Sequence, residues 1–431
     1  MLHRSVRVLG MGLVLLLIAW GARVTFLEGF WLKWPDFHGD FTAVMFSYNY
    51  WVGHRGIPYG PLFVIESWYV TQWPDVFTPV FFALANIPLA IGAYIFCVKA
   101  CRASVPVVFI GLAAWLCYWR MFYAFAVAAN PEFLELFFLS GAWFAATRRN
   151  DVAEGLGIAA AALTKLIPWV FLFPLIVRRS VRALRLAAVL AIAVFVVVGI
   201  GQQMSVPALL FQAIVPFNGR PAPALVPASH STQWVGLLEV VARMLYGPRP
   251  LDGTALHVVQ GLFLTIMAVV LGGTVWGTIR LQRRRSRIGD EACLALTYAM
   301  YFALVPVLSL AAHPHTFLFL LPVWLVFIDQ LWKEEGHVMR RAIFAALVGF
   351  CYAQTGFPVV FALMDKVVRP WVWLRNSWVV AEPMIGTVLL MTLIWAYIAV
   401  KTGEPVSEGS PAAPADEPAL RPLSHPEARR V

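Results

Sequence analysis

The sequence predicts an all-α protein that crosses a membrane many times, and three observations lead to this fold class. Of its 431 residues, 60% are hydrophobic and only 13% are charged, whereas a soluble domain carries about 25% charged residues. Apolar runs of roughly 17 to 25 residues, the length that crosses a bilayer, recur along the chain. The cations behind the net charge of +10 form short clusters, and each cluster ends an apolar run. This is the pattern of a multi-pass protein of the cell membrane, so a nucleic-acid partner is not expected.

The basic clusters predict the topology, because cations concentrate in cytoplasmic loops. The apolar run at about 8–27 follows Arg4 and Arg7 and is interpreted as a retained signal anchor. The segment 152–177 is interpreted as a hairpin with Lys165 at its external apex. The remaining spans are expected near 78–98, 103–119, 131–146, 184–202, 257–279, 291–310, 315–331, 341–362 and 383–400. The prediction is about 11 to 13 membrane helices, with both termini in the cytoplasm.

Two long loops, 28–77 and 203–255, are external in this topology, and the first is expected to carry short amphipathic helices. Residues 1–401 are expected to form a single transmembrane unit. The tail 402–431 is rich in Pro, Ala and Glu, and we expect it to be disordered in the cytoplasm. The five cysteines lie in or beside apolar runs without metal-ligand spacing, so neither a metal site nor a disulfide framework is indicated.

Polar side chains outside the basic clusters gather on the predicted external side. Ionisable groups at membrane depth are costly and therefore tend to be functional or paired. The group comprises Asp36, His38, Asp40, His54, Arg55, Glu66, Asn130, Glu132, Lys165, Asn218, Arg220, His230, Gln233, His313 and His315. Their convergence on one side predicts an external polar cleft.

Each of these residues also has a purely structural interpretation. Asp36 and Asp40, four residues apart, could solvate one face of a loop helix. Lys165 could extend its ammonium group to the membrane interface. The two histidines flanking Pro314 could form only a turn, and Glu132 could be a first-turn acid favoured by the helix dipole.

An acid, a lysine and histidines at an external membrane cleft suit sugar transfer from a lipid phosphate. A carboxylate deprotonates the acceptor hydroxyl as general base. Cations and imidazoles offset the charge that develops on the leaving phosphate. The lipid tail stays in the bilayer, so its phosphate lies at the interface, within reach of Lys165, His313 or His315.

Four segments of the sequence carry a family resemblance, at residues 39–64, 146–179, 230–245 and 308–327. Their order resembles the integral-membrane glycosyltransferases of the GT-C superfamily, in particular family 87, the polyprenyl-phosphate-mannose-dependent mannosyltransferases. "GDFTAVMFSYNYWVGHRGIPYGPLFV" places Asp40 at the family's catalytic acid, with Tyr59 and Pro61 as later landmarks. "ATRRNDVAEGLGIAAAALTKLIPWVFLFPLIVRR" places Lys165 at the family lysine. "HSTQWVGLLEVVARML" fits a later segment loosely, with His230 where asparagine is commoner. "LSLAAHPHTFLFLLPVWLVF" is similar to the late turn, whereas "NPEFLEL" departs from the family pattern.

The resemblance implies a GT-C fold and an inverting transfer from a polyprenyl-phosphate sugar to a lipid-linked glycan or glycolipid. Asp40 would be the base, and Lys165 with His313 or His315 would hold the donor phosphate. The acceptor and sugar sites would draw on Asp36, His54, Arg55, Tyr59, Glu132 and His230. No nucleotide cofactor and no divalent metal is predicted.

Three other interpretations stay open. A transporter or lipid flippase would place charged or helix-breaking residues near mid-membrane in paired spans, whereas most spans here carry polar groups at one end. A non-catalytic scaffold of a polysaccharide assembly complex would tolerate loss of Asp40. A related enzyme could use another lipid-linked sugar, such as arabinose, glucose or an aminosugar.

Overall fold

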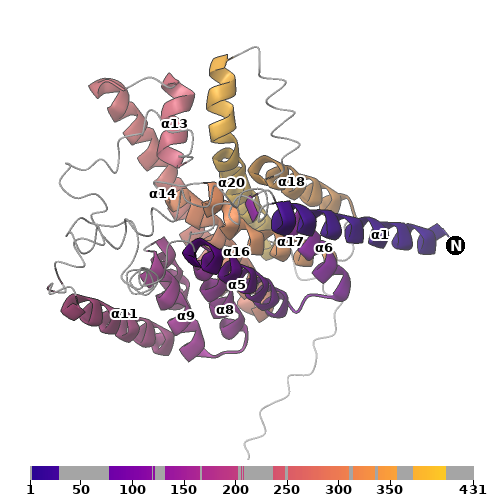
Figure 1. Cartoon of the computed structure of the whole chain (residues 1–431), viewed down its shortest axis with the longest axis horizontal. Helices are drawn as coiled ribbons and strands as arrows, with labels where there is room; N and C mark the ends of the chain where they lie inside the picture. The colour runs from indigo at the N-terminus through magenta and orange to yellow at the C-terminus, as the bar shows by residue number, and fades with distance from the viewer. Residues whose placement is uncertain are drawn as a thin grey trace, which may run out of the picture.

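The computed structural model of the chain is a bundle of helices (Figure 1). It describes residues 2–28, 77–118, 120–121, 132–165, 167–201, 205, 207, 236–247, 251–309, 314–334, 338–356 and 372–403. These residues form helices and turns, with no strand among them. Within this part of the chain, five helices are long and apolar enough to cross a membrane on their own. They are Val181–Gly201, Gly253–Arg283, Asp290–Leu308, His315–Lys333 and Ala381–Gly403. The predicted class, an all-α polytopic membrane protein, is confirmed.

The helices coincide with the predicted spans. They are α1 (Leu2–Ala22) with the π-helical turn η1 (Arg23–Glu28), α5 (Phe77–Cys101), α6 (Val105–Leu116), α8 (Glu132–Thr147), α11 (Val181–Gly201), α14 (Gly253–Arg283), α15 (Arg285–Ile288), α16 (Asp290–Leu308), η5 (Pro314–Leu320), α17 (Leu321–Lys333), α18 (Val338–Gly356) and α20 (Val372–Gly403). Helix α20 differs most from the prediction, because it begins well before residue 383 and ends at Gly403. Residues 402–403 of the predicted tail are therefore helical.

The predicted hairpin at 152–177 is confirmed. Its first arm is α9 (Asp151–Thr164), and its second consists of the 3₁₀ turn η3 (Ile167–Phe171) and α10 (Leu172–Val177). The Asn150 side chain caps α9 by accepting a hydrogen bond from the Ala153 N–H at 3.1 Å. At the far end of the hairpin, Arg178 forms an ion pair with the buried Glu154. This contact holds the two arms together, with Lys165 at the turn between them.

Helices α16 and α17 form the centre of the bundle (Figure 1). In α16, 83% of the apolar stretch is buried, compared with 22% in α14. Peripheral helices instead expose large aliphatic side chains, among them Ile192 and Ile200 on α11 and Val269 on α14. In a bilayer such faces contact lipid tails, so they need no protein partner.

The loop predicted at 203–255 contains a helix that we did not expect. Helix α13 (Leu237–Tyr246) packs against α14 and α20, and its residues 237–243 are buried. Its two charged residues form an ion pair, in which Arg243 Nε lies 2.8 Å from Glu239 Oε1. The segment is too short to span a membrane, and its charges interrupt the apolar pattern. Hydropathy therefore gave no sign of it.

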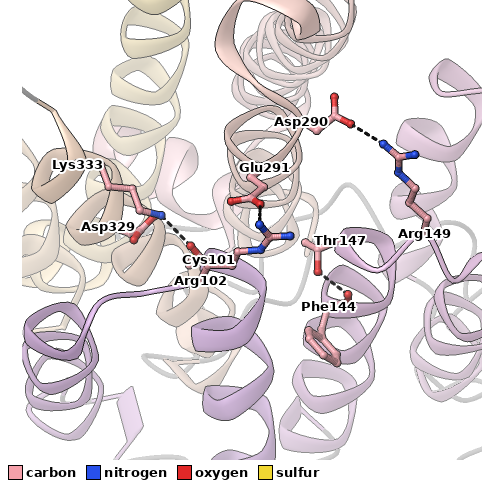
Figure 2. A network of polar contacts seen from close by, with 9 residues as sticks. All are labelled: Cys101, Arg102, Phe144, Thr147, Arg149, Asp290, Glu291, Asp329 and Lys333. Carbon is pink, nitrogen blue, oxygen red and sulfur yellow. Dashed lines mark hydrogen bonds and ion pairs between the residues drawn. The ribbon is translucent and has the colours of Figure 1, made fainter. Parts of the chain in front are cut away.

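The connections that carry the basic clusters meet at one end of the bundle (Figure 2). Arg149 Nη2 lies 3.3 Å from Asp290 Oδ2, and Arg102 forms an ion pair with Glu291 (Figure 2). Lys333 Nζ donates to the carbonyl oxygen of Cys101 at 2.8 Å. The turns after α5, α8, α15 and α17 are thus neighbours, as the topology requires. Exposed ion pairs of this kind contribute little stability. Here they show which turns are adjacent in the fold.

At this end of the bundle, three arginines follow the last turn of a helix and adopt the left-handed conformation. Their φ angles are 48° at Arg102, 54° at Arg149 and 58° at Arg179. Each N–H bonds the carbonyl three residues back, and the next N–H bonds the carbonyl five residues back. This is the Schellman cap, which normally has glycine at the left-handed position. Here arginine supplies a cation at the cost of backbone strain.

Replacing Arg179 therefore gives a stability prediction. Arg179→Gly is expected to exceed Arg179→Ala in stability by about 1 kcal/mol, because glycine adopts φ of 58° without a Cβ clash. Both variants lose the same charge, so the comparison isolates the backbone. Thermal unfolding in detergent measures the difference, and equal midpoints for the two variants would contradict the expected strain.

Candidate functional site

Three of the predicted site residues converge on one carboxylate oxygen. Lys165 Nζ lies 2.5 Å from Oε1 of Glu132, and His315 Nε2 lies 3.3 Å from the same atom. Glu132 begins α8, Lys165 is the C-cap of α9, and His315 lies in η5. The chain thus brings together residues separated by up to 183 positions, and all three side chains are largely enclosed.

Glu132 is held at the start of a helix. It is the first residue of α8, where the helix dipole favours an anionic side chain. The side chain is only 1% exposed, and a buried carboxylate is stable only when a cation or hydrogen-bond donors accompany it. Lys165 and His315 fill that role, which makes the three residues one electrostatic unit.

Lys165 reaches Glu132 because α9 ends at this residue. Its backbone is extended, with φ of −146° and ψ of 142°, and its N–H still bonds the carbonyl of Ala161. Pro168 follows three positions later and has no N–H to continue the helix. Gly157 lets α9 approach α8 closely, since a Cβ there would lie 2.9 Å from the Phe138 carbonyl oxygen. The short interhelical distance and the helix end together place the ammonium group beside Glu132.

His315 is fixed by the packing of η5. This 3₁₀ helix contacts both α8 and α16, and Phe317 and Leu318, which follow the histidine, are fully buried. Trp115 anchors the start of α17 by donating from Nε1 to the Leu321 carbonyl oxygen at 2.9 Å. The histidine therefore faces Glu132 from a rigid segment.

One oxygen of the Glu132 carboxylate can accept a further hydrogen bond. Among the described residues, Oε2 of Glu132 is buried without a hydrogen-bond partner. The cluster therefore combines an acceptor oxygen with an ammonium group and an imidazole. Cations with N–H donors bind phosphate by charge-assisted hydrogen bonds, and the carboxylate oxygen suits a hydroxyl.

The cluster lies at the end of the bundle away from the basic connections. Helix α8 runs from Glu132 to Thr147, just before Arg149. At about 1.5 Å per residue, its length separates the two ends by roughly 22 Å. The predicted separation of the polar site residues from the basic clusters therefore holds for Glu132, Lys165 and His315.

The other predicted site residues lie outside the described part of the chain, and their roles stay predictions. They are Asp36, Asp40, His54, Arg55, Tyr59, His230 and His313. The same applies to the amphipathic helices predicted for the loop 28–77, of which residues 29–76 are outside the description.

The structure adds two buried ionisable residues that the sequence analysis passed over. Arg120 donates from Nε to the carbonyl oxygen of Thr355 at 2.9 Å, and its guanidinium lies over the ring of Phe317. Glu382, on α20, is 1% exposed. Each is a single charged residue within an apolar stretch of the sequence, "YWRMFY" for Arg120 and "VVAEPMIG" for Glu382. That isolation was the available signal, since charges within spans are rarely incidental.

One sequence profile identifies the family of the chain. The sequence profile described as glycosyltransferase family 87 matches residues 58–306, more than half of the chain. The chain therefore belongs to glycosyltransferase family 87 and is a multi-pass membrane glycosyltransferase. The matched region contains Tyr59, Glu132, Lys165 and His230, whereas Asp40 and His315 lie outside it. No curated protein and no solved structure matches the chain.

Proposed function

We propose that this glycosyltransferase transfers a mannosyl or related residue from a polyprenyl-phosphate donor to a hydroxyl of a lipid-linked glycan or glycolipid. The observation that carries the proposal is the contact of Lys165 and His315 with one buried oxygen of Glu132. A cation and an imidazole enclosed at one end of a membrane bundle are suited to a lipid phosphate, whose tail stays among the helices.

The proposed mechanism gives each group one task. Lys165 and His315 stabilise the negative charge that grows on the phosphate as the glycosidic bond breaks. Glu132 positions both of them, and its Oε2 accepts a hydrogen bond from a sugar or acceptor hydroxyl. Asp40 removes the proton of the attacking hydroxyl as general base. Attack from the face opposite the phosphate inverts the anomeric centre.

The reaction is proposed to occur on the external face of the cell membrane. Cations mark cytoplasmic connections, and Arg102 and Arg149 lie at the end of the bundle opposite Glu132. The phosphate site would then open to the outside, with both termini in the cytoplasm.

A transfer assay tests the donor class. The full chain in nanodiscs is incubated with radiolabelled polyprenyl-phosphate-mannose and membrane lipids of the parent strain, and product lipids are separated. Labelled product is expected. Transfer only from a lipid-linked glucose, arabinose or aminosugar would keep the reaction and change the donor. Absence of transfer from every such donor, combined with movement of the lipid across the bilayer, would favour a flippase.

Metal removal gives an independent prediction. Transfer is expected to be unchanged by EDTA, because Lys165 and His315 supply the charge that a divalent cation would otherwise place on the phosphate. The assay is the one above, with and without chelator. Activity lost with EDTA and restored by Mg²⁺ or Mn²⁺ would contradict this prediction. Asp36 and Asp40 would then be the candidate metal ligands.

A further inference from the structure

A second buried polar cluster packs against η5 at Phe317, two residues beyond His315. The guanidinium carbon of Arg120 lies 5.5 Å from the centre of the Phe317 ring, and Arg120 Nε holds the Thr355 carbonyl oxygen at the end of α18. Since a 3₁₀ helix rises about 2 Å per residue, this cluster and the Glu132 cluster belong to one region of the bundle.

Glu382 belongs to the same cluster. Four residues further along α20, a Cβ on Gly386 would lie 2.9 Å from side-chain carbons of Gln354 and Thr355. Positions four apart share a helix face, so Glu382 faces the end of α18 where Thr355 meets Arg120. Among the described residues, neither carboxylate oxygen of Glu382 has a hydrogen-bond partner, although the side chain is buried.

This carboxylate lacks the donors that a buried acid requires. No donor among the described residues, Arg120 included, forms a hydrogen bond to its oxygens. A buried acid in this state marks a place where an outside group supplies the hydrogen bonds. Glu382 also lies far from the basic end, because it comes twenty residues before Thr402, which bonds Arg280; that separation is roughly 30 Å.

The chemistry of the cluster limits the class of ligand that it can bind. A carboxylate repels phosphate, which makes a second phosphate site unfavourable. A metal ion is also disfavoured, because the guanidinium of Arg120 repels cations and the described residues contain no group of three metal-ligating side chains. Neutral hydroxyls remain, and adjacent hydroxyls of a pyranose can donate to both oxygens of one carboxylate.

We propose that Glu382, supported by Arg120, binds hydroxyls of a sugar beside the phosphate site of Lys165 and His315. The subsite rests on the proposed function, because it recognises the carbohydrate part of a substrate whose phosphate the Glu132 cluster holds. The sugar belongs either to the donor or to the acceptor, and the two share this diol chemistry.

Three ligands distinguish these sources in binding measurements on the full chain in detergent. They are bare polyprenyl phosphate, polyprenyl-phosphate-mannose and methyl α-mannoside as a soluble substitute for the acceptor sugar. Wild type is compared with Glu382→Gln, which keeps the shape of the side chain and removes its charge. Asp329→Asn is the matched control, since it alters a buried acid at the basic end that pairs with Lys333.

If Glu382 binds the donor sugar, Glu382→Gln will lose about tenfold in affinity for the mannose-bearing lipid and none for the bare lipid, the effect of one hydrogen bond to a charged group. If it binds the acceptor sugar, the loss will appear for methyl α-mannoside alone. Affinities unchanged for both sugars would overturn the subsite.

The same measurements separate this inference from the proposed function. Binding of bare polyprenyl phosphate confirms that Glu382→Gln is folded; should that binding fail, Glu382→Asp, with a shorter reach, takes its place in the same comparison. If Lys165→Met binds bare polyprenyl phosphate as tightly as wild type, the proposed phosphate site is wrong, whatever Glu382 does.

Discussion

Asp40→Asn is expected to lower the rate of sugar transfer by about 10²- to 10⁴-fold, the usual contribution of a general base. Asparagine preserves the shape of the side chain but cannot accept the proton of the attacking hydroxyl. The loss should fall on kcat, with KM for the donor nearly unchanged. The measurement is transfer from radiolabelled polyprenyl-phosphate-mannose with purified enzyme.

Asp36→Asn is the matched control for this prediction. The two acids lie four residues apart in one segment, and the resemblance to the family assigns the catalytic position to Asp40. The control is expected to retain most of the activity. A greater loss with Asp36→Asn than with Asp40→Asn would assign the general base to Asp36. Full activity in both variants would show that neither acid is the general base.

Lys165→Met is expected to reduce kcat/KM by about 10²-fold or more, because the leaving phosphate loses its closest cation. It should also destabilise the fold, since Glu132 keeps a buried negative charge with a weaker partner; breaking a buried pair costs about 3–5 kcal/mol. The double variant with Glu132→Gln removes both charges and should recover stability without recovering transfer. Thermal unfolding and transfer per folded molecule measure the two effects separately.

Lys333→Met controls for the loss of a lysine from a buried acid. Lys333 Nζ lies 2.8 Å from Asp329 Oδ2, at the opposite end of the bundle from Glu132. This variant should lose stability but retain transfer per folded molecule. If Lys165→Met behaves in the same way, its lysine is a structural partner of Glu132 and the proposed phosphate site is wrong.

The fold class and most helix positions were predictable, because both depend on local properties of the chain. A run of apolar residues long enough to cross the bilayer must become a helix, since lipid offers no partner to backbone polar groups. The basic clusters predicted that the turns near Arg102, Arg149 and Lys333 lie on the same side, and the contacts in Figure 2 agree. The hairpin around Lys165 was also predictable, since two short apolar arms flank one charge.

The sequence also contained signals that were passed over. Helix α13 is short and amphipathic, so a search for apolar runs could not find it, and only its contacts with α14 and α20 show that it is buried. Arg120 and Glu382 are single charges in apolar segments, and ionisable residues within membrane spans tend to be functional. Without the structure, nothing indicated that they meet.

By itself, then, the sequence determined that this is an all-α membrane protein, where most of its helices lie and which isolated polar residues are candidates for function. Only the tertiary structure decided that Glu132 joins Lys165 and His315 through one oxygen atom. The physical reason is the range of the interactions. Hydropathy and charge patterns act over the length of one helix, whereas an ion pair needs atoms within a few ångströms. For residues 132, 165 and 315, that proximity depends on how separate helices pack.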